Sequence, residues 1–333
     1  MSGIVEGYVT QLGDSSLDSR SKLNVVVELR DSVEMGQITA DSELFVSNLL
    51  PVLLKLLEET QVSMQSNSTE HKIRNCVLDT IYRLQPTDAL EPQAGALIDL
   101  ATKIIKEDNE ENGVLCMKFI ANIFRFYKTK LSEHVVPFIQ LIITIIEHVP
   151  AVIREYFDNL DADSSENNKS PVLPSTPSGT TPVTPSSSVS LQAGQNNNVN
   201  TLCPAISSLK VLMESPIIMV VLANHHRQLV SEYFPTFVPR VLGILTLEAK
   251  PQADEHARAS EAGTFFTGVS PVIRNSQYSS QYTDLITVQI KFISFIVFVI
   301  RSFAPILNTQ ISIVPSMIIR LLKDCPPHAY MAR

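Results

Sequence analysis

The chain has 333 residues, of which 44% are hydrophobic and 18% are charged, and its formal net charge at pH 7 is −8. This composition excludes a disordered chain, and the length suffices for one large domain or two ordinary ones. The negative charge argues against direct nucleic-acid binding, which depends on neutralising phosphates.

Helical spacing of apolar residues runs through most of the chain. In residues 42–59 the apolar positions fall three and four residues apart, as on one wide face of an α-helix. They are Leu44, Phe45, Leu49, Val52, Leu53, Leu56 and Leu57. The same spacing recurs in residues 71–84, 113–127, 135–149, 237–247 and 313–324. No stretch alternates convincingly like a β-strand, so the sequence predicts an all-α fold.

Residues 106–118, KEDNEENGVLCMK, combine an acidic turn with the start of a helical pattern. The run lacks the spacing of a calcium-binding loop, and we interpret it as a helix start. Asp108 is expected to cap the helix and Glu111 to reach back, while the carboxylates favour the positive helix end. The apolar face then begins at Val114 and Leu115.

Four basic residues follow in this helix and just after it: Lys118, Arg125, Lys128 and Lys130. With helical spacing, several of them can share a face and receive an acidic peptide from a protein partner. The simpler alternative is a solvated helix end. We therefore treat the four residues as a candidate protein-binding cluster.

Residues 161–200 interrupt the helical pattern with Ser, Thr, Pro and Asn and little that is apolar. Such a segment cannot offset the entropy of ordering, so we expect a disordered linker. It separates helical repeats in residues 1–160 from further repeats in residues 201–333. Ser170, Thr176, Thr181 and Thr184 each precede proline and are candidate phosphorylation sites, although such pairs also arise freely in this composition.

A short pattern recurs four times: two apolar residues, a proline and an apolar helix. The prolines are Pro51, Pro137, Pro239 and Pro315, which lie 86, 102 and 76 residues apart. The outer intervals are close to two periods of about 40 residues, the length of a HEAT or armadillo helix pair, and the linker lengthens the middle one. Proline suits a helix start or a tolerated bend. The pattern predicts an α-solenoid of HEAT-type helical pairs, whose extended surface suits protein partners.

Residues 287–305 are the most apolar stretch of the chain. The unbroken core, residues 292–300, is far shorter than the roughly 20 residues that span a bilayer. Lys291 and Arg301 bracket it. We therefore expect no membrane association but a helix of the inner layer of the solenoid.

The motifs of common enzymes are missing. The chain has no GxxxxGK[ST], GxGxxG, GxSxG or HExxH, and none of its four cysteines forms a CxxC pair. The adjacent His225 and His226 point about 100° apart on a helix, so they cannot chelate one ion. The sequence thus predicts no catalytic residue, metal, cofactor or small-molecule substrate.

Four segments of the chain resemble, in order, the amino-terminal region of the TRRAP family of giant transcription-associated proteins, particularly its fungal members. They are residues 50–84, 106–118, 214–245 and 314–326. The resemblance implies that the chain is part of a very large α-solenoid protein that ends in FAT and kinase-like domains. In this family the kinase-like domain lacks the catalytic residues. It also implies that the protein is a subunit of the SAGA coactivator complex and of a MYST-type histone acetyltransferase complex.

The resemblance therefore implies a nuclear, non-catalytic scaffold for transcription activators and complex subunits. The resemblance assigns no catalytic residue to this sequence, because the kinase-like region would lie far beyond Arg333. Members of the family would continue with more helices, so we expect a C-terminal truncation, from a gene model, a splice product or a fragment. The residue pattern alone leaves another HEAT-type adaptor open, such as a transport receptor or a phosphatase scaffold. An enzyme related to active kinases is a third alternative.

Overall fold

The structure is a computed structural model that describes residues 2–38, 43–166, 201–247 and 276–304, with residues 312, 314–316, 318 and 319. Helices make up nearly all of these ranges, which contain no β-strand. The first half holds α1 (Ser2–Gly13), α2 (Ser19–Glu34), α3 (Leu50–Glu59), α4 (Thr69–Tyr82), α5 (Glu91–Glu107), α6 (Glu110–Tyr127) and α7 (Ser132–Glu166). The second holds α8 (Leu209–Leu212), α9 (Ser215–His225), α10 (Arg227–Leu245) and α12 (Ser276–Phe303). The prediction of an all-α fold is confirmed.

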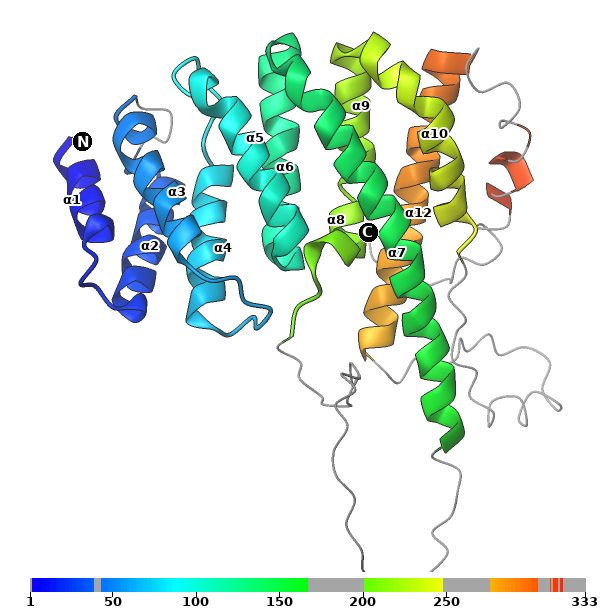
Figure 1. Cartoon of the computed structure of the whole chain (residues 1–333), viewed down its shortest axis with the longest axis horizontal. Coiled ribbons are helices and arrows are strands. Elements are labelled where there is room, and N and C mark those ends of the chain that lie inside the picture. The colour runs from blue at the N-terminus through cyan, green and yellow to red at the C-terminus, as the bar shows by residue number, and fades with distance from the viewer. Residues whose placement is uncertain are drawn as a thin grey trace, which may run out of the picture.

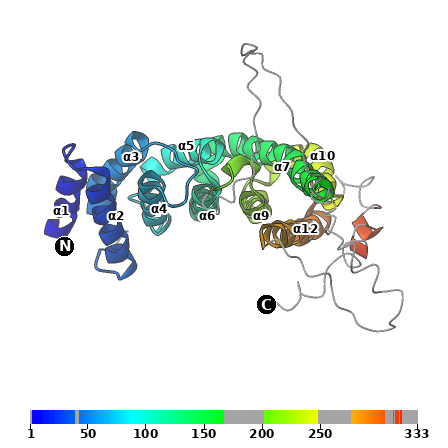
Figure 2. The same ribbon diagram turned by 90° about the horizontal axis from the view of Figure 1, so that it is seen from below.

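The helices form a two-layered stack that extends away from α1 (Figure 1). Seen along the helices, α3, α5, α7 and α10 make one row, and α2, α4, α6, α9 and α12 make the other (Figure 2). Across the rows α3 packs on α4, α5 on α6, and α10 on both α9 and α12, and within the rows α2 packs on α4, α4 on α6, α6 on α9, and α7 on both α5 and α10. The buried apolar residues from all of them belong to one continuous core. This arrangement is the predicted α-solenoid.

Prolines recur along one of the two layers, although Pro216 also lies in the first turn of α9 in the other layer. Pro51 lies in the first turn of α3, whereas Pro137 and Pro239 lie inside α7 and α10. These helices share a row in Figure 2 with α5, whose first turn contains Pro92. Pro92 completes the series at intervals of about 40 residues, the length of a HEAT helix pair. The sequence pattern missed it because Leu90 and Glu91, not two apolar residues, precede it.

A π-helical turn, Phe45–Leu49, leads directly into α3. The proline ring at position 51 has no N–H to donate to the carbonyl of Ser47 and would collide with it in a regular α-helix. The wider π-turn relieves this clash. The periodic stretch at residues 42–59 is therefore helical, but it is a wide turn followed by an α-helix.

Aromatic side chains join α10 to α12. Phe295 lies 5.5 Å from Phe237 and 6.4 Å from Phe234, measured between ring centroids, and Phe303 lies 4.7 Å from Phe234. All four rings are buried. Residues Gln281–Phe303 have the length and composition of a membrane-spanning helix, as does the stretch Glu110–Ala151. The buried side of α12 nevertheless packs on α8, α9 and α10 within the stack, as a core helix does.

Helix α7 continues to Glu166, past the expected end of the first group of repeats at residue 160. The remainder of the expected linker, with Ser170, Thr176, Thr181 and Thr184, lies outside the described residues. In the part of the chain that follows the expected linker, α9 packs against both α6 and α7. The helices on the two sides of the expected linker thus share one stack.

Candidate functional site: a buried polar junction

The acidic stretch at residues 106–118 forms the tight turn between α5 and α6. Asp108 ends α5 and Asn109 caps α6, accepting a hydrogen bond from the backbone N–H of Asn112 at 3.1 Å. The predicted cap was wrong by one residue, and Glu111 does not reach back along its own helix. Its carboxylate accepts a hydrogen bond from His71 of α4. Asp108 is unsuited to capping because its side chain serves a different contact.

That contact is an ion pair between Asp108 and Arg74 of α4. The Arg74 Nε donates to Asp108 Oδ2 at 2.7 Å, and the side chains are 7% and 0% exposed. The other end of the guanidinium donates to the carbonyls of Leu57 and Thr60, at 2.6 and 2.8 Å, where α3 ends. One arginine therefore ties together α3, α4 and the α5–α6 turn. Buried charges are tolerated only when paired and hydrogen-bonded in this way.

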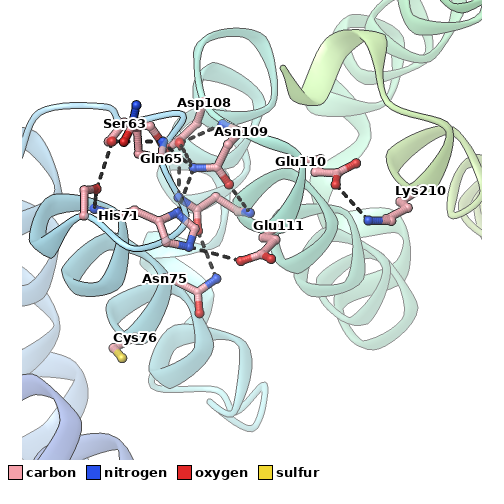
Figure 3. Close-up of polar contacts among 12 residues, drawn as sticks. Ser63, Gln65, His71, Asn75, Cys76, Asp108, Asn109, Glu110, Glu111 and Lys210 are labelled. Atoms are coloured by element: carbon pink, nitrogen blue, oxygen red, sulfur yellow. Dashed lines mark hydrogen bonds and ion pairs between the residues drawn. The ribbon is translucent and has the colours of Figure 1, made fainter. Parts of the chain in front are cut away.

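Asn109 and His71 extend this network to the loop before α4 (Figure 3). The Asn109 side-chain amide donates to the carbonyl of Ser63 at 3.0 Å and to His71 Nδ1 at 3.1 Å. Since Nδ1 accepts, the imidazole carries its proton on Nε2, which donates to the Glu111 carboxylate at 3.1 Å. His71 and Asn109 are 3% and 0% exposed. These bonds fix the distance between α4 and α6.

Glu110, the next residue, faces the opposite way, toward the segment that follows the expected linker. Its carboxylate accepts hydrogen bonds from Ser208 Oγ at 2.9 Å and from Lys210 Nζ at 2.8 Å. Glu110 lies in α6, Ser208 caps α8, and Lys210 is in α8. The α5–α6 turn thus bonds α4 on one side and the segment around α8 on the other. We name the set Arg74, Asp108, Asn109, Glu110 and His71 the polar junction.

Most of the polar junction could not be predicted from the sequence. Periodicity gives α4 an apolar face through Ile73, Val77 and Ile81, and the charged Arg74 beside Ile73 was the one available signal for a buried ion pair. No local signal links Glu110 with Lys210. They lie 100 residues apart.

The structure separates the four predicted basic residues. Lys118 and Arg125 are exposed and seven residues apart on α6, so they lie on the same side of the helix. Lys128 and Lys130 fall in the following 3-10 turn, Lys128–Leu131. Lys130 forms an ion pair with Glu91, and both line an open pocket of about 560 Å³ that also contains Glu133 and His134. Lys130 therefore belongs to surroundings of mixed charge.

Lys128 has a structural role through its backbone. Its φ of 49° lies in the left-handed region, and this backbone conformation ends α6. Its carbonyl accepts a hydrogen bond from His226 Nε2 at 2.9 Å. His226 lies between α9 and α10 and is 6% exposed. The contact therefore places the end of α9 against the end of α6.

This contact predicts a pH dependence of stability. Burial lowers the pKa of His226 below its ordinary value near 6.5, with a further lowering by His225, and the bond to Lys128 only partly opposes this. The unfolded chain then takes up the proton at a higher pH than the folded chain, so stability falls as the pH drops below about 6.5. Urea unfolding of the chain at pH 7.5, 6.5 and 5.5 measures the fall.

His226→Gln is the matched variant, because its amide can still donate to the Lys128 carbonyl but does not titrate. Carboxylates titrate equally in both proteins, so the variant is expected to lose less stability over this range. Equal losses in the two proteins would show that His226 is not responsible.

The polar groups of the junction are buried and bonded to one another, which suits them to fixing helices in place. Within the described ranges, no group of three or more His, Cys, Asp or Glu side chains could hold a metal ion. The described cysteines Cys76, Cys116 and Cys203 are free thiols, and burial raises the pKa of Cys203 to about 11. Stacked helix pairs, prolines that recur along a layer and buried polar turns define a helical-repeat protein of the HEAT type.

Comparisons with known proteins place this solenoid in a family. Residues 281–333 match the family "Tra1 HEAT repeat central region". The chain is 31% identical, over 99% of its length, to the SAGA complex/NuA4 acetyltransferase complex subunit TRA1 of Saccharomyces cerevisiae. It is 29% identical over 98% of its length to Tra1 of Schizosaccharomyces pombe, and 21% identical over 96% to the transformation/transcription domain-associated protein of Homo sapiens.

The chain belongs to the TRRAP/Tra1 family, as the sequence resemblance indicated. It spans 9% of the length of each of the two yeast relatives and 8% of the human one.

Proposed function

We propose that the chain is a non-catalytic scaffold segment of a nuclear histone acetyltransferase coactivator complex. Its family relationship supports the proposal, because the two yeast relatives are named as subunits of the SAGA and NuA4 acetyltransferase complexes. The observation that carries it is the match to these subunits over nearly the whole chain, combined with one continuous helical stack. The relatives' transcription-associated names support a nuclear location.

The scaffold acts by holding protein-binding surfaces at fixed separations. Each helix pair buries its apolar face against its neighbours, so the outward side chains of successive helices keep a constant spacing. The polar junction reinforces this at the turn between α5 and α6. No step of chemistry is assigned to these residues, and partners are bound through the exposed helix faces.

The outward face of α6 is the part of this surface that we assign to acidic partners. Lys118 and Arg125 are exposed there, and neighbouring Phe126 is 49% exposed. Cations beside an exposed ring suit a segment that carries both carboxylates and apolar side chains. Activators and complex subunits with such segments are the proposed partners.

Copurification tests the proposal in the native protein. The endogenous gene product that contains this chain is tagged at its amino terminus, purified, and its companions identified by mass spectrometry. Acetyltransferase subunits are the expected companions. Small GTPases with cargo, or phosphatase subunits, found in their place would show a different HEAT-type adaptor and overturn the proposal.

The surface on α6 is tested separately in the same tagged protein. Lys118→Glu with Arg125→Glu should weaken the recovery of acidic partners without loss of the protein, because both side chains are exposed. Lys72→Glu, an exposed lysine on α4, is the control and should leave recovery unchanged. Equal recovery in the two variants would remove α6 from the proposed binding surface.

A further inference from the structure

The segment Thr201–Leu212, which we name the return strap, binds the first half of the solenoid through its backbone. The N–H of Leu202 donates to the carbonyl of Met64 at 2.6 Å. The N–H of Glu110 donates to the carbonyl of Cys203 at 2.8 Å, and the N–H of Ala205 donates to the carbonyl of Asp108 at 2.9 Å. The strap therefore binds two separate loops, one before α4 and the other between α5 and α6.

The apolar side chains of the return strap enter the core. Ala205, Val211 and Leu212 are completely buried, and Leu209 is 3% exposed. They pack on α6 and α7, both of which precede the strap in the chain. Burial of these apolar side chains stabilises the contact, and the cost of ordering the segment offsets part of that gain.

Gly113 of α6 makes room for this approach. A Cβ atom at this position would lie 2.5 Å from the Cβ of Ala205 and 3.0 Å from Cγ2 of Val211. The first distance is shorter than side chains tolerate and the second is tight, so the strap reaches its observed position only over a glycine. Its fit to α6 is therefore specific in shape.

Glu110 supplies a specific polar contact. Its carboxylate is largely buried and bonds both the Ser208 hydroxyl and the Lys210 ammonium. Charge-assisted hydrogen bonds of this kind are stronger than neutral ones. The neighbouring Glu111 instead accepts from His71 and does not bond the strap. Two adjacent glutamates thus serve opposite sides of the turn.

We propose that the surface formed by Met64, Asp108, Glu110 and Gly113 is a docking site for the return strap, and that this docking, together with the packing of α9 on α6 and of α10 on α7, holds α8–α12 on α1–α7 without covalent continuity between residues 166 and 201. The occupant of the site is this chain's own segment. Partners that contact both halves of the scaffold consequently depend on the strap being docked. The proposal goes beyond the scaffold function and stands on contacts within the chain alone.

Cleavage of the whole folded chain tests the proposal. The recognition sequence of a site-specific protease is inserted between Thr184 and Pro185, the chain is purified and cut, and the product is examined by size exclusion with light scattering. The two pieces are expected to elute together as a 1:1 complex at micromolar concentration and to keep the helical circular dichroism of the uncut chain. Elution as two separate pieces would overturn the proposal.

Matched variants show whether the docking site itself holds the pieces together. In the cut chain, Glu110→Gln is expected to speed dissociation about tenfold, because two charge-assisted bonds are weakened. Glu111→Gln is the control and should change the rate far less, because Glu111 bonds His71 on the other side of the turn and acts on Lys210 only through longer-range charge attraction. Equal rates in the two variants would contradict the assignment of Glu110.

A double variant covers the case in which a single substitution affects folding. Gly113→Ala should loosen the cut complex at least tenfold, because its Cβ collides with that of Ala205. Ala205→Gly in the same protein removes the closer of the two colliding atoms and should recover much of the loss. Absence of any loosening in the Gly113→Ala protein would show that the strap is not docked against α6 in solution. Loosening without recovery would place the effect outside the Gly113–Ala205 contact.

Discussion

Replacing Arg74 with methionine is expected to lower the free energy of unfolding by about 3–5 kcal/mol, the usual cost of removing one partner of a buried ion pair. Methionine keeps most of the volume, so a cavity does not explain the loss. The variant leaves the Asp108 carboxylate buried without its cation, and it leaves the carbonyls of Leu57 and Thr60 without a donor. Urea unfolding followed by circular dichroism measures the change.

Arg83→Met, at the C-terminal end of the same helix, is the control. Arg83 also pairs with carboxylates, those of Asp79 and Glu34, but its side chain is 34% exposed. Such exposed pairs contribute at most about 1 kcal/mol. Adding Asp108→Asn to the Arg74 variant should restore part of the stability, because the unpaired charge is gone. Similar losses for Arg74 and Arg83, or no restoration, would show that the buried pair is not the dominant contact of the junction.

The overall architecture was predictable because it depends on local, repeated features. Apolar residues at helical spacing predicted the helices, and the intervals between the recurring prolines predicted stacked helix pairs. In the structure Pro51, Pro137 and Pro239 lie in helices of one row of the stack. A solenoid suits such reasoning, since each repeat contacts only its neighbours and carries the same pattern.

The polar junction was predictable only in part. The turn at residues 106–118 was identified as a helix start, but the choice of Asn109 over Asp108 as the cap depends on Arg74, which lies 34 residues away. Capping propensities do not distinguish Asp from Asn. The deciding contact is tertiary, and although Arg74 beside the apolar face of α4 signals a buried ion pair, the sequence does not identify Asp108 as its partner.

Contacts with residues distant in the sequence also determine how the four basic residues are arranged. Helical spacing correctly indicated that Lys118 and Arg125 share a side of α6, because both lie within the helix. The helix ends at Tyr127, so the spacing no longer applies to Lys130, which instead meets Glu91 at the start of α5. The binding role assigned to Lys118 and Arg125 stays a prediction.

Replacing Phe295 with alanine is expected to cost about 3–5 kcal/mol, as for other buried phenylalanines. Its ring is 2% exposed and meets Phe237, Phe234 and Phe298 at centroid distances of 5.5, 6.4 and 6.4 Å. Truncation leaves a cavity between α10 and α12 and removes these ring contacts. Each contact stabilises the fold beyond the effect of burying apolar surface. Urea unfolding gives the total loss.

The loss should also be local, which distinguishes a solenoid from a globular core. In a stack of repeats a defect weakens its own repeat and the neighbouring interface most. Amide hydrogen exchange in Phe295→Ala should therefore accelerate in α10 and α12 and remain slow in α4–α6, where the polar junction lies. Ile290→Ala, 46% exposed on the same helix, is the control and should change stability by no more than about 0.5 kcal/mol. Uniform acceleration through α4–α6 would mean that the helices unfold as one unit, so that positions far apart on the scaffold could not respond independently to their partners.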